Sequence, residues 1–230
     1  MTIAVIIPTL NESSTIARTL THTVALGFDE IVVSDGGSTD TTLPMVQACC
    51  ARVPAVQLVT ALTGRARQLN EGVKACRSEI VLFLHADTEL PPQAKTVIES
   101  TLQNPHYVGG RFDVCFDRPS RWGTIISWFM NRRSRLSGIA TGDQAIFVRR
   151  QIFEQMGGFP DIPLMEDIEF SRRLKRQGPT AALTDCVTTS FRRWEQNGPL
   201  RTIFLMWTLR FLYWLGVRPA RLNHWYRAVR

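Results

Sequence analysis

Three acidic side chains follow apolar runs of the chain, at positions where they could bind a ligand or a metal ion. Asp35 comes after "EIVVS", Asp87 after "IVLFLHA", and Glu12 directly after "VIIPTLN". In open α/β sheets, ligands bind beyond the carboxyl ends of the strands. A carboxylate there can accept hydrogen bonds from a ligand or coordinate a hard cation such as Mg²⁺ or Mn²⁺. Gly36, next to Asp35, would let backbone amides approach a bound group.

A second group of polar residues lies later in the chain. In "PLMEDIEF", Glu166 and Asp167 open a helix, where a carboxylate can act as a general base or simply stabilise the helix dipole. Arg65 begins another helix, and its guanidinium suits phosphate oxygens, although it could equally be a solvated helix start. The stretch Gly142, Asp143 and Gln144 either lines a site or forms a turn before a short strand.

The first half of the chain alternates between strand and helix patterns. The β-branched run "IAVIIPTLNE" precedes a helix that Ser13 or Ser14 could cap, and strands are predicted at 30–34 and 56–61. Helical patterns follow each of them, and "EIVLFLHADT" reads as the fourth strand. Four such alternations predict a mostly parallel sheet with helices on both faces.

From about residue 110 this alternation breaks down. An amphipathic, basic segment covers 118–135, and the most apolar helix covers 200–215. That helix would be about 24 Å long, shorter than a bilayer core of about 30 Å. Since Arg201 and Arg210 lie on opposite faces, no single clean apolar stripe is expected. The helix is expected either to pack on the domain or to lie in a membrane interface.

Composition limits the class of protein. With 230 residues, 44% hydrophobic and 20% charged, the chain is an ordinary globular protein. The net charge of +7 invites a nucleic-acid interpretation, but the arginines are scattered and no nucleic-acid module is recognisable, so no nucleic-acid partner is expected. Five cysteines without a C-x-x-C pair argue against disulfides or zinc and favour the cytoplasm. No signal peptide, spanning segment, dinucleotide fingerprint or P-loop is evident.

Four stretches in this order carry a family resemblance: "VIIPTLNE", "VVSDGGSTDTT", "FLHADT" and "GGFPDIPLMEDIEFSRRL", within residues 5–174. Together they resemble the inverting family 2 glycosyltransferases. "GRARQLNEG" and "GDQAIFVRR" resemble a bacterial subgroup called radical-SAM/selenodomain-associated transferases. The resemblance implies the GT-A fold, a mixed, mostly parallel sheet flanked by helices, with a C-terminal helical extension. We expect a single domain, with a nucleotide-sugar-binding half (1–109), an acceptor and catalytic half (110–195), and an apolar helix with a basic tail (196–230).

The resemblance also implies roles for the donor side of the site. Asp35 would hold the nucleoside, Arg65 would contact the diphosphate, and Pro8, Glu12 and Gly36 would line the same pocket. Asp87 matches the last acid of the metal-binding Asp-X-Asp motif, so Mn²⁺ or Mg²⁺ is the expected cofactor. His85 replaces the first acid of that motif, which would weaken metal binding; His85 itself is expected to pack at the strand end.

On the acceptor side, the resemblance implies that Asp167 is the general base and that Glu166 supports it. Gly142, Asp143 and Gln144 would line the sugar or acceptor site. Arg193 and Trp194 would close over the diphosphate and acceptor, or Trp194 would merely anchor the last helix.

The expected function is therefore inverting transfer of a sugar from a nucleotide diphosphate, UDP favoured, to a hydroxyl acceptor. A lipid-linked acceptor and a cytoplasmic location at the inner membrane face fit the basic and apolar segments of the second half. Two alternatives remain open: a sugar nucleotidyltransferase, and a catalytically silent nucleotide-sugar-binding protein at the membrane surface.

Overall fold

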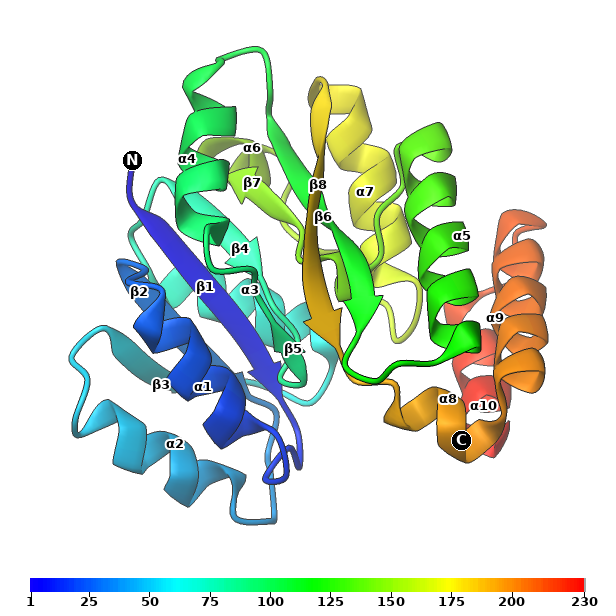
Figure 1. The fold of residues 1–230 in the computed structure, drawn as a ribbon, viewed down its shortest axis with the longest axis horizontal. Coiled ribbons are helices and arrows are strands. Elements are labelled where there is room, and N and C mark those ends of the chain that lie inside the picture. The colour runs from blue at the N-terminus through cyan, green and yellow to red at the C-terminus, as the bar shows by residue number, and fades with distance from the viewer. Residues whose placement is uncertain (230) are drawn as a thin grey trace.

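The computed structural model describes residues 1–229, apart from the side chains of residues 193 and 227–229. Within this part of the chain, eight strands form one sheet in the order β3-β2-β1-β4-β7-β6-β8-β5 (Figure 1). The strands are β1 (Ile3–Thr9), β2 (Glu30–Asp35), β3 (Val56–Thr60), β4 (Ile80–Phe83), β5 (Thr88–Glu89), β6 (Gly109–Phe116), β7 (Phe147–Arg149) and β8 (Thr180–Thr189). The helices are α1 (Ile16–Ala25), α2 (Thr42–Cys50), α3 (Arg65–Ala75), α4 (Ala94–Gln103), α5 (Arg121–Ser137), α6 (Arg150–Gln155), α7 (Glu166–Gln177), α8 (Arg192–Asn197), α9 (Pro199–Trp214) and α10 (Pro219–Val229).

The sheet is parallel in its first half and mixed in its second. β1 pairs in parallel with β2 on one side and with β4 on the other. β7 is antiparallel to both β4 and β6, while β6 and β8 run parallel. This arrangement confirms the predicted α/β class with a mostly parallel sheet. The division into a donor half and an acceptor half stays a prediction.

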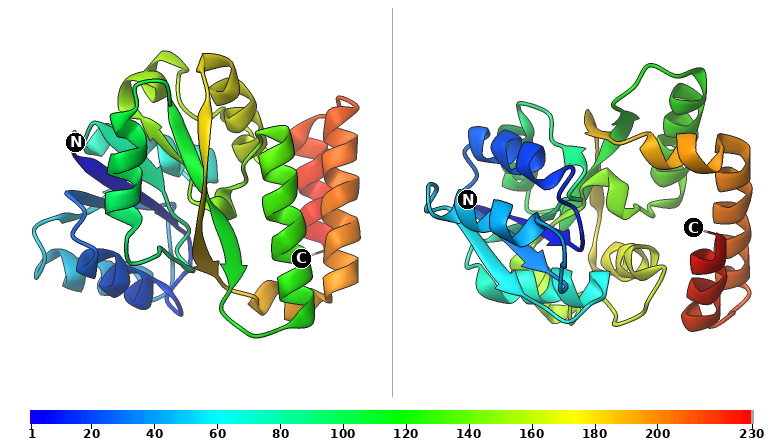
Figure 2. Two further views of the ribbon diagram at one scale, coloured as in Figure 1. Left: turned by 45° about the horizontal axis from the view of Figure 1, so that its top comes forward. Right: turned by 90° about the horizontal axis from the view of Figure 1, so that it is seen from below.

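Alternate residues of β1 enter two different cores. Ile3, Val5 and Ile7 pack on one face of the sheet, together with residues of α1, α2 and α4. Ala4 and Ile6 pack on the other face against α3, α6 and α7. Helices therefore cover both faces, as the two-residue period of a strand requires (Figure 2). α3 can approach β1 closely because Gly72 lacks a side chain: a Cβ there would lie 2.4 Å from Cγ2 of Ile6.

Elements with a weak sequence signal were not predicted. β8 has the sequence "TAALTDCVTT", in which polar and small residues interrupt the apolar ones, and most of its residues are only half-buried. It forms because β6 and β5 pair with its two edges. α8 was missed because it is short and polar, and α10 because polar residues interrupt its apolar ones. α1 begins after Thr15 without a side-chain cap, so neither Ser13 nor Ser14 caps it.

α9 agrees with the prediction that no single clean apolar stripe forms, because apolar residues occur on its exposed and on its buried face. Its exposed large apolar side chains recur every three or four residues, which places them on one face of the helix: Leu200, Phe204, Trp207, Phe211 and Trp214, each between 58% and 78% exposed. The opposite face buries Thr202 and Leu209. This exposed apolar stripe is therefore one of two apolar faces of the helix. No helix of the described chain is long and apolar enough to cross a membrane.

Candidate functional site

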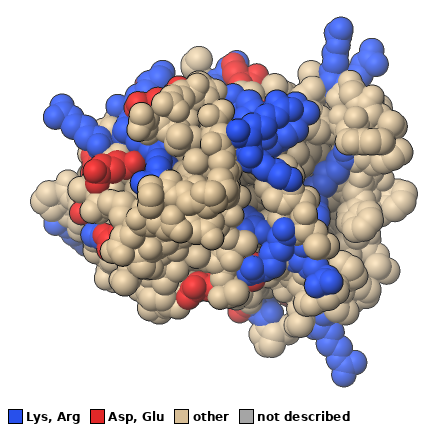
Figure 3. Space-filling view, turned by 90° about the horizontal axis from the view of Figure 1, so that it is seen from above, with Lys and Arg blue, Asp and Glu red and all other residues tan. Residues whose placement is uncertain are grey.

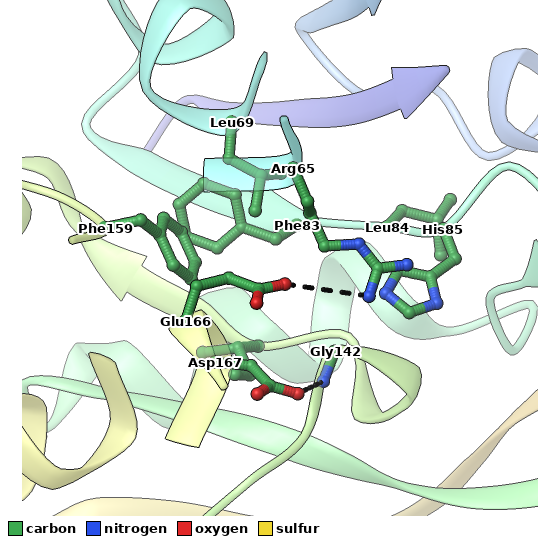
Figure 4. Close-up of a pocket in the computed structure, with 10 residues that line it drawn as sticks. Arg65, Leu69, Phe83, Leu84, His85, Gly142, Phe159, Glu166 and Asp167 are labelled. Carbon is green, nitrogen blue, oxygen red and sulfur yellow. Dashed lines mark hydrogen bonds and ion pairs between the residues drawn. The ribbon is translucent and has the colours of Figure 1, made fainter. Parts of the chain in front are cut away.

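A pocket opens beyond the end of β4, between the first turns of α3 and α7 (Figure 4). Its apolar floor is formed by Leu69, Phe83 and Phe159. Four polar side chains point into it from three separate parts of the chain: Arg65, His85, Glu166 and Asp167. The structure thus brings together residues that lie about a hundred positions apart in the sequence.

The position of Asp167 is fixed at both of its carboxylate oxygens. Oδ2 accepts a hydrogen bond of 2.9 Å from the Gly142 backbone N–H, and Oδ1 accepts one of 2.7 Å from the Ile168 N–H. Behind it, Phe170 of α7 is fully buried and stacks on Phe159 with 4.1 Å between ring centroids. The helix that carries Asp167 is therefore anchored in the core, and its carboxylate faces the pocket.

Glu166 and Arg65 form an ion pair across the pocket, with 3.8 Å between Oε1 and Nη1. Glu166 is buried, and this burial together with the charge of Asp167 raises the pKa of its carboxyl, against the opposing effect of Arg65. The negative charges of Glu166, Asp143 and Asp167 raise the pKa of the Arg65 guanidinium, although the surrounding protein partly desolvates it. Arg65 is therefore a fixed positive charge, suited to phosphate oxygens.

His85 ties the end of β4 to the loop at 142–144. Its Nδ1 lies 3.1 Å from Oδ1 of Asp143. The ring also packs against Gly142, where a Cβ would lie 2.4 Å from Nε2. Gly142 thus lines the pocket, and Asp143 lies next to it, paired with His85. Gln144 is fully buried instead: its Oε1 accepts from the Thr141 N–H and its Nε2 donates to the Phe112 carbonyl, so it shapes the loop from the core side.

Asp35 lies at the end of β2 and is only 1% exposed. Its Oδ2 accepts hydrogen bonds of 2.8 Å from the backbone N–H groups of Gly37 and Ser38. Its Oδ1 accepts from the hydroxyls of Thr9 and Ser38. These four bonds occupy the acceptor sites of a carboxylate. A nucleoside N–H would have to displace one donor, and the rotatable Ser38 hydroxyl is the easiest to displace.

Glu12 follows β1 and Asp87 follows β4, two strands that pair in parallel, and the two carboxylates are close enough to interact electrostatically. Burial and, after it, the negative charge of Asp87 raise the pKa of the Glu12 carboxyl. Among the described residues, no cluster of three His, Cys, Asp or Glu side chains is arranged to hold a metal by itself. Two carboxylates nevertheless fit the usual way in which Mg²⁺ is held, by one or two carboxylates plus substrate phosphates. The donor set therefore suits a divalent cation that arrives with a diphosphate.

The remaining predicted residues lie further out. Pro8 lies in β1 beside Ser34 of β2. Trp194 is half-buried in α8. Its ring packs against that of Phe116, with 6.1 Å between the ring centroids, which favours the anchoring role. The side chain of Arg193 lies outside the described residues.

Three residues that support or surround the site were not predicted from the sequence. Gln68 is buried under Gly36 and donates to the carbonyls of Thr9 and Ser34, which joins the ends of β1 and β2. A glutamine among the apolar positions of "GRARQLNEG" was the available signal. Arg133 and Arg210 lie on α5 and α9, and both interact electrostatically with Asp167. Nothing local in the sequence connects them.

Comparison with known proteins defines the class. The model of glycosyl transferase family 2 matches residues 4–157, and the chain therefore belongs to this family. The probable glycosyltransferase YdaM of Bacillus subtilis (strain 168) is 26% identical over 220 residues, which cover 85% of this chain and 50% of that protein. The chain thus spans about half the length of this curated relative.

Solved structures show the same fold. S. aureus TarS 1–349 in complex with UDP has a TM-score of 0.66 and 20% identity, covering 83% of this chain and 61% of that chain. The mannosyltransferase PcManGT from Pyrobaculum calidifontis, in complex with GDP-Man and Mn²⁺, has a TM-score of 0.65 and 24% identity, covering 82% and 56%. This likeness confirms the GT-A fold. The radical-SAM/selenodomain subgroup stays a prediction.

Proposed function

We propose that the chain transfers a sugar, with inversion, from a nucleotide diphosphate donor to a hydroxyl acceptor. The observation that carries this proposal is the pocket that Asp167, held by the Gly142 N–H, lines together with the cationic Arg65. One group can remove a proton from the acceptor, while the other can neutralise the departing diphosphate. Membership of family 2 supports sugar transfer as the reaction.

The donor would bind across the ends of β1, β2 and β4. Asp35 and Gly36 would hold the nucleoside, with Pro8 and Glu12 beside it. Arg65 would contact the diphosphate. TarS has been solved with UDP and PcManGT with GDP-Man, so both nucleotides are reasonable donors, and UDP is the one we favour.

Glu12 and Asp87 would hold a divalent cation together with the diphosphate oxygens, and Mn²⁺ in the PcManGT complex supports this. Such a cation supplies Lewis-acid assistance to the leaving group. His85 would not be a ligand, because its Nδ1 pairs with Asp143 and its Nε2 packs against Gly142.

Asp167 would accept the proton of the acceptor hydroxyl while the oxygen of that hydroxyl forms a bond to the anomeric carbon of the donor sugar. The bond from that carbon to the diphosphate breaks on the opposite face, which inverts the configuration. Glu166 would keep Arg65 oriented toward the diphosphate through their ion pair. Gly142 and Asp143 would shape the sugar side of the pocket.

Replacing the base tests this function. Asp167→Asn keeps the size of the side chain and removes its proton-accepting charge. We expect release of UDP from a UDP-sugar, with water as the acceptor, to fall by about 100-fold or more while UDP affinity is retained. Asp161→Asn is a matched control, since this exposed carboxylate pairs with Arg67 at the surface. Equal hydrolysis by wild type and Asp167→Asn would remove Asp167 from the role of base.

We also propose that the exposed faces of α5 and α9 contact an anionic membrane surface, where a lipid-linked acceptor would lie. Trp122, Ile125 and Phe129 of α5 are exposed, like the apolar stripe of α9. In Figure 3 an uncharged surface at the end of the molecule is flanked by basic side chains. Aromatic residues beside arginines suit the interface of anionic lipids. Flotation with phosphatidylglycerol vesicles tests this contact, and a protein that stays at the bottom of the gradient contradicts it.

A further inference from the structure

α9 is held against the start of the helix that carries Asp167. Leu209 of α9 and Leu222 of α10 form a buried cluster with Met165, the residue just before α7. Ile168 of α7 packs against the same cluster. α9 also lies beside α5 at this end of the molecule (Figures 1 and 2). Arginines on α5 and α9 are therefore positioned relative to Asp167 by core packing.

Arg133 of α5 and Arg210 of α9 form a pair of like charges beside Asp167. Burial and, after it, the positive charge of Arg210 lower the pKa of Arg133 to about 10, with Asp167 and Asp143 opposing the shift. Burial also lowers the pKa of Arg210, again against the effect of Asp167 and Asp143. The two guanidiniums thus repel each other. The positive charge of Arg111 also lowers the pKa of Arg133.

Neither guanidinium is satisfied by the protein. Nε and Nη2 of Arg133 and Nε of Arg210 are buried and lack hydrogen-bond partners in the described chain. Neither arginine forms an ion pair with a described residue. Burying an unpaired charge is costly, and a bound anion would remove both the loss of hydrogen bonds and the repulsion. Phosphate oxygens match the fork of donors of a guanidinium.

We propose that Arg133 and Arg210 bind a phosphate group of the acceptor. The acceptor is then a phosphate-bearing hydroxyl compound, with its hydroxyl at Asp167 and its phosphate between α5 and α9. The assignment to the acceptor rests on the proposed function. The donor diphosphate is assigned to Arg65 and Asp87, which lie on α3 and after β4, and the two arginines come from the other half of the chain.

Calorimetric titration with inorganic phosphate, at constant ionic strength, tests the subsite without a donor. We expect wild type to bind phosphate, and Arg133→Gln and Arg210→Gln to bind at least tenfold more weakly. Arg132→Gln and Arg201→Gln, exposed neighbours on the same two helices, should stay within twofold of wild type. Without phosphate, Arg133→Gln and Arg210→Gln should each unfold at or above the wild-type temperature, because an unpaired charge is removed. Absence of phosphate binding in wild type, or equal loss in the control variants, overturns the proposal.

Two further measurements place the phosphate. Phosphatidylcholine vesicles containing phosphatidic acid carry a terminal phosphate, whereas those with phosphatidylglycerol carry only a diester. If Arg133→Gln and Arg210→Gln lose binding only to the vesicles that contain phosphatidic acid, the phosphate belongs to a lipid headgroup. If their binding to both kinds of vesicle is unchanged, the phosphate belongs to a soluble acceptor. UDP affinity should be the same in all variants, and a tenfold loss would assign the arginines to the donor and overturn the proposal. If wild type binds phosphate through these arginines but no nucleotide, the subsite stands and the transferase function fails.

Discussion

At Gly142 the absence of a side chain decides how closely His85 and Asp167 can approach the same loop. The backbone N–H of this residue donates to Asp167, and its Cα packs against the His85 ring. A Cβ would lie 2.4 Å from Nε2 of His85, which no real contact tolerates. One position therefore couples the orientation of the predicted base to the end of β4.

Gly142→Ala should consequently displace the His85 ring or the loop that orients Asp167. We expect UDP-sugar hydrolysis to fall about tenfold or more, with a loss of about 1–3 kcal/mol in unfolding free energy from overpacking. Steady-state kinetics and denaturant unfolding measure the two effects. The double variant Gly142→Ala/His85→Ala removes the clash and should recover most of the unfolding free energy. If it recovers none, the contact with His85 is not the cause.

Glu166 predicts a pH dependence of stability. Burial and Asp167 raise the pKa of its carboxyl in the folded state. Between its unfolded and folded pKa values the folded state holds the extra proton, so the free energy of unfolding falls as pH rises above about 4.5. Each unit of upward shift corresponds to about 1.4 kcal/mol.

Glu166→Gln should remove this slope. Urea unfolding of both proteins between pH 4 and 8 should show a difference in stability that grows in favour of the variant as pH rises. Loss of the ion pair with Arg65 changes only the offset between the two curves, because Arg65 stays protonated throughout. Parallel curves would show that Glu166 keeps an ordinary pKa.

The sequence predicted residues at the ends of strands well, because a parallel sheet places them at one edge. Asp87 and Asp35 follow their strands as expected, and Asp167 opens its helix. The burial of the Gln144 side chain was not predictable. It depends on the capping box that Gln144 forms with Thr141, and this local structure forms only when the loop packs against the core. The proximity of Arg133 to Arg210 was not predictable either, because it depends on how α5 and α9 pack.

At the scale of elements, α7 links the core to the pocket. Its buried residues Phe170 and Leu174 enter the second core, while Glu166 and Asp167 emerge at its first turn. The helix follows Met165, a buried residue with a φ of 70°. This unfavourable left-handed conformation persists because the side chain of Met165 packs in the cluster with α9 and α10.

Phe170→Ala should therefore affect both stability and activity. Removing a fully buried aromatic ring that stacks on Phe159 is expected to cost about 3–5 kcal/mol of unfolding free energy. UDP-sugar hydrolysis should fall as well, because the first turn of α7 loses its anchor. Denaturant unfolding and kinetics below the transition provide the measurements. Phe204→Ala, 75% exposed on α9, is the control and should change stability by less than about 0.5 kcal/mol. A similar loss in both variants would contradict the anchoring role.

For the whole molecule, α9 carries its exposed apolar stripe on one side and packs with its other side against Met165, the residue before α7. Leu209 faces the cluster beside Asp167, whereas Trp207 and Phe211 face outward. A contact between the stripe and a membrane would therefore hold α9, and Arg210 with it, close to the lipid surface. This links the proposed membrane surface to the proposed acceptor phosphate site.

Trp207→Ser/Phe211→Ser should weaken binding to phosphatidylglycerol vesicles by at least tenfold. Each ring that leaves water contributes about 1.5–3 kcal/mol, and the two side chains are 66% and 58% exposed in the structure. Hydrolysis of a UDP-sugar in solution should be unchanged, because the stripe faces away from Asp167. Leu62→Ser is a matched control, an apolar residue 73% exposed on the loop after β3. Sedimentation of the free protein separates the alternative: a wild-type dimer that the double variant abolishes would assign the stripe to a second copy of the chain.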